Sequence, residues 1–441
     1  MTLTPPPETA CPLPPKSARL RRIQTTSLAL LVLMGVINYV DRATLAIASP
    51  LIREELGWSI SDMGLLLSAF LGAYALAQLP AGMVVDRFGP RLVLSVGLAV
   101  WSLAQLLGGF ARGFGQFFAT RSVLGIGEAP QFPANVKVVC EWFQKRERGA
   151  ATGMWNSSST MGTAISAPLL TFLMLRYGWR EMFVIMGVAG LLVSAVFWAV
   201  YRSPAACALE EDERLYLADG HEQTRPEPFT LRDWLHLFRF RTTWGMICGF
   251  AGTVYLLWIY NAWLPTYLQM ERHFTVQKTG WVAAIPFLFG IFGSLCGGHL
   301  CDLLLKRGIS PIASRKWPML ISLLGGALFS VLAAATPSDR LAIAFIAVAM
   351  FLLYVASSAA WAMAPVAAPQ NSTASLGAVQ NFGGYCGGTV APALTGFIVE
   401  KTKSFAPALT TGATIAVVAA LLYGLLVGQP VAARKTPCAD A

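Results

Sequence analysis

Apolar runs of about 20 residues recur along the whole of this sequence, and each is long enough to cross a lipid bilayer as one helix. Of the 441 residues, 55% are hydrophobic and only 13% are charged. A soluble domain has about 25% charged residues. Because only helices and closed barrels satisfy their backbone hydrogen bonds inside lipid, the sequence predicts an all-α polytopic membrane protein.

Twelve of these runs are expected to be transmembrane helices, arranged as two halves of six. The only long polar stretch, which contains EEDER and RPEP, separates the sixth run from the seventh. The predicted spans are residues 26–48, 61–84, 90–110, 114–138, 149–174, 180–201, 243–269, 278–303, 317–336, 340–363, 373–398 and 405–428. The predicted organisation is a disordered cytoplasmic arm (1–25), an N-terminal six-helix bundle (26–201), a cytoplasmic linker (202–242), a C-terminal six-helix bundle (243–428) and a cytoplasmic tail (429–441).

Basic residues are concentrated on alternate loops. With the first residues inside the cell, the basic side chains of the inner segments are Lys16, Arg19, Arg21, Arg22, Arg87, Arg91, Lys145, Arg146, Arg148, Lys306, Arg307, Arg315 and Lys316. The opposite loops carry scattered single charges. This positive-inside bias predicts that the protein lies in the inner membrane with both termini in the cytoplasm. It also accounts for the net charge of +10 without nucleic acid as a partner.

Four charged residues lie well inside predicted spans, away from the span ends. Asp41 and Arg42 belong to the first span, and Arg121 and Glu128 belong to the fourth. A charge at the bilayer centre costs roughly 2.5–3.5 kcal/mol on insertion scales, so such residues face a bundle interior, pair with each other and mark a substrate or proton path. Helical spacing places Asn38, Asp41 and Arg42 on one face, and Arg121 and Glu128, which are seven residues apart, share another.

These side chains suit an organic anion coupled to a proton. An arginine is always charged and binds a carboxylate through two parallel hydrogen bonds, so Arg42 and Arg121 predict an anionic substrate. When that anion occupies an arginine, a neighbouring carboxylate such as Asp41 or Glu128 loses its partner and takes up a proton more easily. A structural buried ion pair is the alternative for each of the four.

Two similar segments close the second and eighth spans. GMVVDRFGPR covers 82–91 and GHLCDLLLKRG covers 298–308, and each has an aspartate four residues after a glycine. This repeat predicts two parallel six-span halves, with a binding site at the midplane between them. The expected cytoplasmic gate contains a glycine for close helix approach and charged residues that pair across the halves, namely Gly82, Asp86, Arg87, Arg91 and Asp302. The simpler interpretation is a turn with positive-inside charges.

The segment GMVVDRFGPR resembles the loop signature of the major facilitator superfamily. More specifically, the chain from about residue 26 to 428 resembles the anion:cation symporter family within it. The similarity rests on NYVDR (38–42), FLGAYALAQLPAG (70–82), RSVLGIGEAPQFPA (121–134), YGWREMF (177–183) and QNFGGYCGG (380–388). Members of that family move organic anions, including galactonate, glucarate and hexuronates, mostly by proton symport in bacteria.

The resemblance also implies roles for individual residues. The positions matching Asp41 and Glu128 are protonation sites in galactonate transporters, and the position matching Arg42 contacts substrate. Arg121 matches a motif arginine that is expected to pair with Glu128. Further polar and aromatic candidates for the substrate site, which could equally serve helix packing, are Tyr39, Tyr74, Gln78, Asn156, Ser159, Trp258, Asn261, Ser358, Trp361 and Asn381.

Other classes of function lack support in the sequence. There is no GxxxxGK[ST] phosphate loop, catalytic triad or zinc spacing among the eight cysteines and four histidines. We therefore expect no enzyme activity, no metal and no cofactor. The prediction is a monomeric importer of a hydroxylated carboxylate, such as a sugar acid, by proton symport through alternating access. Alternatives are sodium-coupled or exchange transport of a dicarboxylate or aromatic acid, or a non-transporting sensor with the transporter fold.

Overall fold

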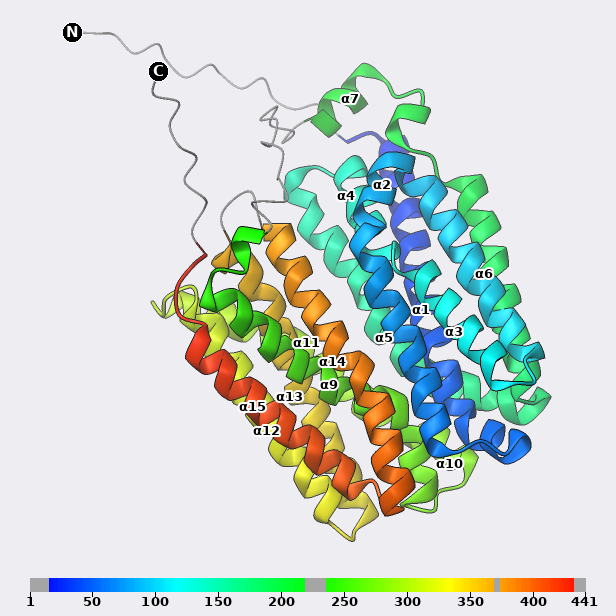
Figure 1. Cartoon of the computed structure of the whole chain (residues 1–441). Helices are drawn as coiled ribbons and strands as arrows, with labels where there is room; N and C mark the ends of the chain where they lie inside the picture. The colour runs from blue at the N-terminus through cyan, green and yellow to red at the C-terminus, as the bar shows by residue number, and fades with distance from the viewer. Residues whose placement is uncertain (1–15, 219–234, 369–372, 432–441) are drawn as a thin grey trace.

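The structure, a computed structural model, describes residues 16–218, 235–368 and 373–431. All regular elements in these ranges are helices, and they form two bundles side by side (Figure 1). The N-terminal bundle contains α1 (Ala18–Leu56), α2 (Ile60–Phe110), α3 (Phe114–Glu128), α4 (Gln131–Trp142), α5 (Lys145–Tyr177) and α6 (Trp179–Val200). The C-terminal bundle contains α9 (Arg241–Met270), α10 (Val276–Val282), α11 (Ala284–Lys306), α12 (Ala313–Ala335), α13 (Asp339–Ala367), α14 (Thr373–Thr402) and α15 (Ala406–Leu426).

Eleven helical segments in the described ranges are long and apolar enough to span a membrane, so the chain is a multi-pass membrane protein. The long helix α2 supplies two of them. The fourth predicted span, 114–138, is instead built from α3 and α4, which have 15 and 12 residues. Twelve spans therefore stays a prediction.

Two helix interruptions follow from local sequence. α2 bends at Gly89, whose φ of +78° is left-handed and whose neighbour is Pro90. Pro130 stands between α3 and α4 and has no N–H to donate, so it interrupts the helical hydrogen bonds there. This break places Glu128 in the last turn of α3, deep in the bundle.

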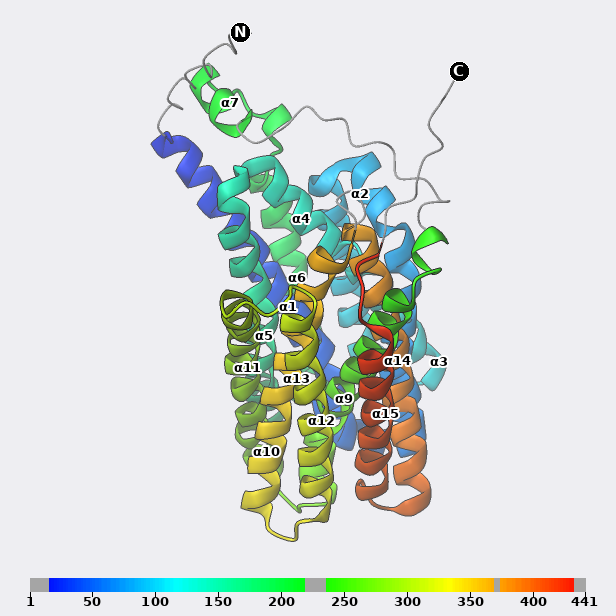
Figure 2. The ribbon, with the colours of Figure 1, turned by 90° about the vertical axis from the view of Figure 1, so that its left-hand side faces the viewer.

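α1 begins and α15 ends at the same end of the bundles, called here the terminal end (Figures 1 and 2). At the opposite, distal end the two halves touch closely along α2 with α14 and along α5 with α10. A Cβ atom on Gly64 would lie 2.6 Å from the Pro392 carbonyl oxygen, and one on Gly280 would lie 2.6 Å from the Thr171 hydroxyl oxygen. Small residues allow such approaches between helices in lipid.

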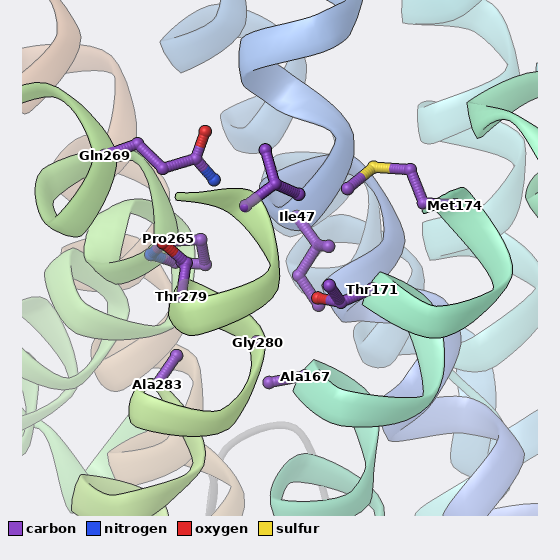
Figure 3. Close-up of a pocket in the computed structure, with 10 residues that line it drawn as sticks. Ile47, Ala167, Thr171, Met174, Pro265, Gln269, Thr279, Gly280 and Ala283 are labelled. Carbon is purple, nitrogen blue, oxygen red and sulfur yellow. The ribbon is translucent and has the colours of Figure 1, made fainter. Parts of the chain in front are cut away.

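A small hollow remains within this distal seam, between α1, α5, α9 and α10 (Figure 3). Apolar side chains such as Ile47 and Met174 form most of its wall, and Thr171, Gln269 and Thr279 supply its polar groups. It is lined by no charged residue, so it lacks the groups that an anion would need.

The linker between the halves is partly helical. A short 3-10 turn (Pro204–Ala206) precedes α7 (Glu211–Ala218), which lies at the terminal end against the start of α1 (Figure 2). Ser17 caps α1, so helix begins inside the arm expected over 1–25. The rest of that arm up to residue 15, the linker residues 219–234 and the tail from residue 432 fall outside the described residues.

Candidate functional site

The buried charges of α1 and α3 meet at the centre of the N-terminal bundle. The Nε atom of Arg42 donates a hydrogen bond of 2.8 Å to Oε2 of Glu128. The Arg42 side chain is 5% exposed and the Glu128 side chain is fully buried. Only part of each group is used, because Nη2 of Arg42 and Oε1 of Glu128 are buried without a hydrogen-bond partner among the described residues. The pair is therefore tight but leaves unused donor and acceptor capacity.

Three aromatic rings surround the Arg42 guanidinium. Its Cζ atom lies 4.8 Å from the ring centre of Tyr39, 5.1 Å from that of Phe70 and 4.9 Å from that of Tyr74. A cation over an aromatic face gains about 0.5–2 kcal/mol, more when water is excluded. These rings hold the charge of Arg42 in place, whether or not Glu128 is bound to it.

Arg121 is held by neutral oxygens, and the prediction that it pairs with Glu128 is wrong. Its Nη2 atom donates to the Thr44 hydroxyl at 3.1 Å and to the Gln105 side-chain carbonyl at 3.0 Å. Its Nη1 atom lies 3.5 Å from the main-chain oxygen of Asp41. Seven residues along a helix correspond to a rise of about 10 Å, so a shared face did not bring Arg121 and Glu128 into contact.

The Asp41 carboxyl group is fully buried, and neither of its oxygens has a hydrogen-bond partner among the described residues. Arg121 is 3% exposed and reaches the backbone of Asp41, but no ion pair within 4.0 Å joins these two described side chains. The neighbouring Asn38 amide is likewise buried with neither polar atom bonded in the described part of the chain. A buried carboxyl group without partners is expensive as a carboxylate.

A chain of polar contacts links this cluster to the C-terminal half. Gln78 on α2 donates to the Tyr74 hydroxyl at 3.1 Å, and Asn381 on α14 donates to the Gln78 side-chain oxygen at 3.0 Å. Tyr385, one turn beyond Asn381, has its ring 4.6 Å from that of Tyr74. Trp258 on α9 lies beside Phe70, with 6.3 Å between ring centres. The structure thus brings together six predicted residues, namely Tyr39, Arg42, Tyr74, Gln78, Trp258 and Asn381.

The remaining predicted substrate residues have other contacts. Asn261 donates its side-chain amide to Leu257 of its own helix. Ser358 packs against Gly297 where α11 crosses α13, and Trp361 is 47% exposed with its ring nearly perpendicular to that of Phe250.

On α5, Asn156 is exposed, and the Ser159 hydroxyl donates to the main-chain oxygen of Asn156. Hydroxyls that bond to their own helix are common within membrane spans. For Asn156, Ser159, Asn261, Ser358 and Trp361, a substrate contact stays a prediction.

The expected cytoplasmic gate is not assembled among the described side chains. A Cβ atom on Gly82 would meet nothing within 4 Å, so close helix approach does not explain this glycine here. Arg87 is exposed and lies over the adjacent Phe88 ring. Arg91 donates to the Trp198 carbonyl of α6 at 2.7 Å, within its own half. The side chain of Asp86 lies outside the described ones.

Asp302, the predicted gate residue of the second half, is exposed. It forms no hydrogen bond or ion pair with any other described residue. The gate therefore stays a prediction, and in this structure Arg91 stabilises the N-terminal half rather than a contact between the halves.

Four residues of the site were missed in the sequence. Phe70 and Tyr385 fall inside motif segments, but an aromatic residue in a membrane span carries no distinctive signal. Thr44 lies one turn after the Asp41 and Arg42 pair, and Gln105 is an amide in an apolar run. The intramembrane position of Gln105 could have marked it, because polar residues there need a partner.

Comparisons with known proteins point to one family of transporters. The family model of the Major Facilitator Superfamily matches residues 31–314. The chain is 42% identical to a probable L-galactonate transporter of Escherichia coli (strain K12), covering 98% of this chain and 96% of that protein. It is 33% identical to a D-galactonate transporter of Escherichia coli O6:H1 (strain CFT073), covering 95% of this chain and 98% of that protein.

Among solved structures, a bacterial homologue of the human lysosomal transporter Spinster has the same fold. Its inward-facing, unoccupied form superposes with a TM-score of 0.79 and 19% sequence identity, covering 93% of this chain and 98% of that one. Within the described residues, no three His, Cys, Asp or Glu side chains lie close enough together to hold a metal ion.

Proposed function

Because this chain belongs to the major facilitator superfamily, and is a transporter rather than an enzyme, we propose that it carries a sugar acid across the inner membrane by proton symport. The galactonates named for its relatives are the first candidates for the substrate. The observation that carries the proposal is the Arg42–Glu128 pair, in which an arginine inside a ring of aromatics is only partly neutralised.

Arg42 is suited to bind the substrate carboxylate. Its Nη2 atom has no partner among the described groups, and a guanidinium with two parallel N–H bonds matches a carboxylate. The rings of Tyr39 and Tyr74 fix the plane of the guanidinium. That plane sets the direction from which an anion can bind. A lysine would supply the charge but neither the fork nor the stacking.

Competition for Arg42 couples the anion to the proton. A substrate carboxylate bound to Arg42 replaces Glu128 as its partner, and the displaced Glu128 carboxylate remains buried. A buried carboxylate that loses its ion pair favours its protonated form. Anion binding and protonation of Glu128 therefore assist each other, as linkage requires. Asp41, buried without partners, is a second proton-binding group.

The hydroxyl groups of the substrate have polar partners in both halves. The Tyr74–Gln78–Asn381 chain crosses the seam beside Arg42. Its amide and hydroxyl groups can each exchange their mutual bonds for bonds to a sugar acid. A ligand that bridges Arg42 on one half and Asn381 on the other is positioned to change how the halves sit, which is what alternating access requires.

The hydrogen bonds between the halves support an inward-facing state. Those formed by described groups lie at the distal end or near the middle, namely Ser61 N–H to Glu400, Ala393 N–H to Ser68, the Arg53 guanidinium to the Met270 sulfur, and Asn381 to Gln78. With the basic loops and both termini in the cytoplasm, the distal end faces outward and is closed.

The test is uptake of labelled L-galactonate and D-galactonate into proteoliposomes with an imposed pH gradient. We expect uptake to rise when the outside is acidic and to collapse when a protonophore removes the gradient. D-glucarate and phthalate in the same assay test the dicarboxylate and aromatic alternatives. Stimulation by sodium, or uptake only into preloaded vesicles, would overturn proton symport. Substrate binding without transport would indicate a sensor.

A further inference from the structure

Arg121 is cradled by two neutral side chains that the coupling scheme above does not use. Thr44 on α1 accepts hydrogen bonds from Arg121 and, at 3.0 Å, from the Gln105 amide, while its own hydroxyl donates to the Asp41 carbonyl at 2.7 Å. Gln105 on α2 also accepts directly from Arg121. Thr44 and Gln105 are both fully buried. Three helices therefore meet in one closed set of hydrogen bonds around a single cation.

This arrangement is unusual because a carboxyl group without partners lies beside it. A buried arginine ordinarily pairs with an acid, since an uncompensated charge in the interior is costly. Arg121 instead bonds to neutral oxygens and reaches only the backbone of Asp41. The Asp41 carboxyl oxygens are left unbonded within the described chain. The cradle thus holds the guanidinium close to Asp41 without allowing it to form an ion pair.

We propose that Gln105 and Thr44 are positioning residues that set the pH at which Asp41 exchanges its proton, an inference that rests on the proposed proton coupling. By holding Arg121 near the carboxyl group but not paired with it, they keep Asp41 able to accept a proton when substrate is present. Without them, Arg121 is free to turn to the nearest unused acceptor, which is the Asp41 carboxylate. That ion pair would hold Asp41 ionised.

Few other charges act on this carboxyl group. Arg121 and Glu128, both on α3, are its charged electrostatic neighbours, and Arg42 follows it in sequence and neutralises Glu128. The other helices packed around α1 carry no charged residue in the stretches 63–78 and 92–110 of α2, 149–175 of α5, 182–200 of α6 and 242–270 of α9. Tyr39 on α1 and Tyr74 on α2, whose rings lie over Arg42, are further titratable groups nearby, and the uncharged Trp101 indole of α2 also acts on the carboxyl group.

The inference predicts pH shifts of opposite sign for two changes at one position. Gln105→Leu removes an acceptor from Arg121, so the midpoint of the pH profile of uptake should fall by about one pH unit, the lower end of the effect of a close opposite charge. Gln105→Glu supplies a carboxylate that neutralises Arg121, so the midpoint should rise by about one unit. Thr44→Val keeps the shape of the side chain and should shift the midpoint in the same direction as Gln105→Leu, but by less.

The experiment measures two pH profiles for the full-length protein: proteoliposome uptake of labelled galactonate, and thermal stabilisation by galactonate in detergent. Ser102→Ala is the matched control, because Ser102 is buried on α2 one turn before Gln105 and its hydroxyl has no partner in the described structure. We expect this control to keep the wild-type midpoint.

Each result decides the matter. Opposite shifts in the two Gln105 variants support the inference. An unmoved midpoint with lower activity, or shifts in one direction for both, overturns it and leaves symport intact. If uptake and binding by the wild-type protein do not depend on pH, both the inference and the proposed coupling are overturned. If neither Gln105 variant folds, a wild-type midpoint in Thr44→Val rules the inference out.

Discussion

At the scale of single residues, the centre of this protein is one arginine with two competing partners. Arg42 is held by Glu128 through a single 2.8 Å hydrogen bond and by three aromatic rings that do not depend on Glu128. The ion pair can therefore open without releasing the arginine. In the proposed symport this separates two tasks, since the rings position the charge and the carboxylate responds to a bound anion.

Replacing Glu128 by glutamine should separate binding from proton coupling. The amide resembles the protonated carboxyl group and cannot ionise, so Glu128→Gln should still exchange galactonate across the membrane. Uptake driven by a pH gradient should fall at least about tenfold, which corresponds to losing about 1.4 kcal/mol of coupling. Counterflow and gradient-driven uptake in the same proteoliposomes measure the two activities.

The charge-matched control is Glu54→Gln, because Glu54 is exposed near the distal end of α1. We expect Glu54→Gln to behave like the wild type in both assays. A Glu128→Gln protein that still concentrates galactonate in response to a pH gradient would remove Glu128 from the coupling scheme.

The sequence identified the charged residues of the site better than it identified their partners. A charge in an apolar run is energetically costly and marks a paired or functional group. This identified Asp41, Arg42, Arg121 and Glu128. Which arginine meets which acid depends on how α1 and α3 cross, and helical spacing contains no information about that crossing. The same limit explains why Gln105 was missed.

At the scale of elements, glycines decide how closely α2 and α3 approach each other. A Cβ atom on Gly125 of α3 would lie 2.4 Å from the Phe70 carbonyl oxygen and 3.0 Å from the Tyr74 nitrogen, both in the backbone of α2. A side chain there must push apart the helices that carry two of the rings around Arg42. Gly82, in contrast, has open space around its Cβ position.

Gly125→Ala should therefore destabilise the protein and weaken substrate binding, whereas Gly82→Ala should do neither in this conformation. Overpacking of this kind costs about 1–3 kcal/mol, while an alanine in an open helical position is neutral or favours the helix by about 1 kcal/mol. Thermal unfolding in detergent, with and without galactonate, compares the two variants. Equal melting temperatures for both would mean that the α2–α3 crossing is not as close as described.

The linker helix α7 is fastened to the N-terminal half by a buried acid. The Ser17 hydroxyl donates to Glu213 at 2.6 Å, and this bond lowers the pKa of the Glu213 carboxyl group. Burial opposes that shift, while the Glu210 backbone N–H and the charge of Arg19 add to it. Tyr216 on the same helix donates to Glu147 of α5 at 3.0 Å. This half of the linker therefore moves with the N-terminal bundle.

Docking of α7 should weaken in acid and in Glu213→Gln. Because the folded pKa is lowered, the stabilisation is complete above the unfolded value of about 4.3 and is lost as the pH falls through the folded pKa. The hydrogen bonds to the charged carboxylate contribute about 1–3 kcal/mol. The protection of the amides of residues 211–218 against hydrogen–deuterium exchange, taken relative to the intrinsic exchange rate at each pH, should fall in Glu213→Gln at neutral pH and in the wild type near pH 3.

Glu211→Gln is a suitable control, since Glu211 is exposed on the same helix, and its exchange should match that of the wild type. Protection of α7 that is identical in Glu213→Gln would show that packing of Tyr216 and Leu217 holds the helix without the acid.

At the scale of the whole molecule, most of the architecture followed from hydropathy. The apolar runs, the polar linker and the two repeated segments were sufficient to predict a helical membrane protein of two halves, because a span must be apolar along its whole length. The broken fourth span was not predicted, since Pro130 lies within an apolar run and proline is tolerated in membrane helices. The end at which the halves touch also could not be predicted, because hydropathy is the same whichever end of the bundles is closed.

The distribution of contacts between the halves leads to a last prediction about motion. The distal end is held by close backbone approaches at Gly64 and Gly280 and by the bond from Ser61 to Glu400. Spin labels on Glu54 and Lys401, exposed beside the distal contacts of Arg53 and Glu400, should give a short distance in the resting protein. Labels on Arg202 and Lys306, exposed at the terminal end, should give a longer and broader one. Both pairs are placed in a chain whose eight cysteines have been replaced.

Acid pH should then move the two distances in opposite directions, because protonation of Glu128 frees Arg42 and favours the state that opens outward to receive substrate. Double electron–electron resonance in lipid nanodiscs measures both distributions across pH, with and without galactonate. In Glu128→Gln, the distal pair should already be lengthened at neutral pH. If both pairs lengthen together, the bundles separate rather than rock about the central site. If neither pair responds to pH while uptake does, the coupling between proton and conformation must lie outside the Arg42–Glu128 pair.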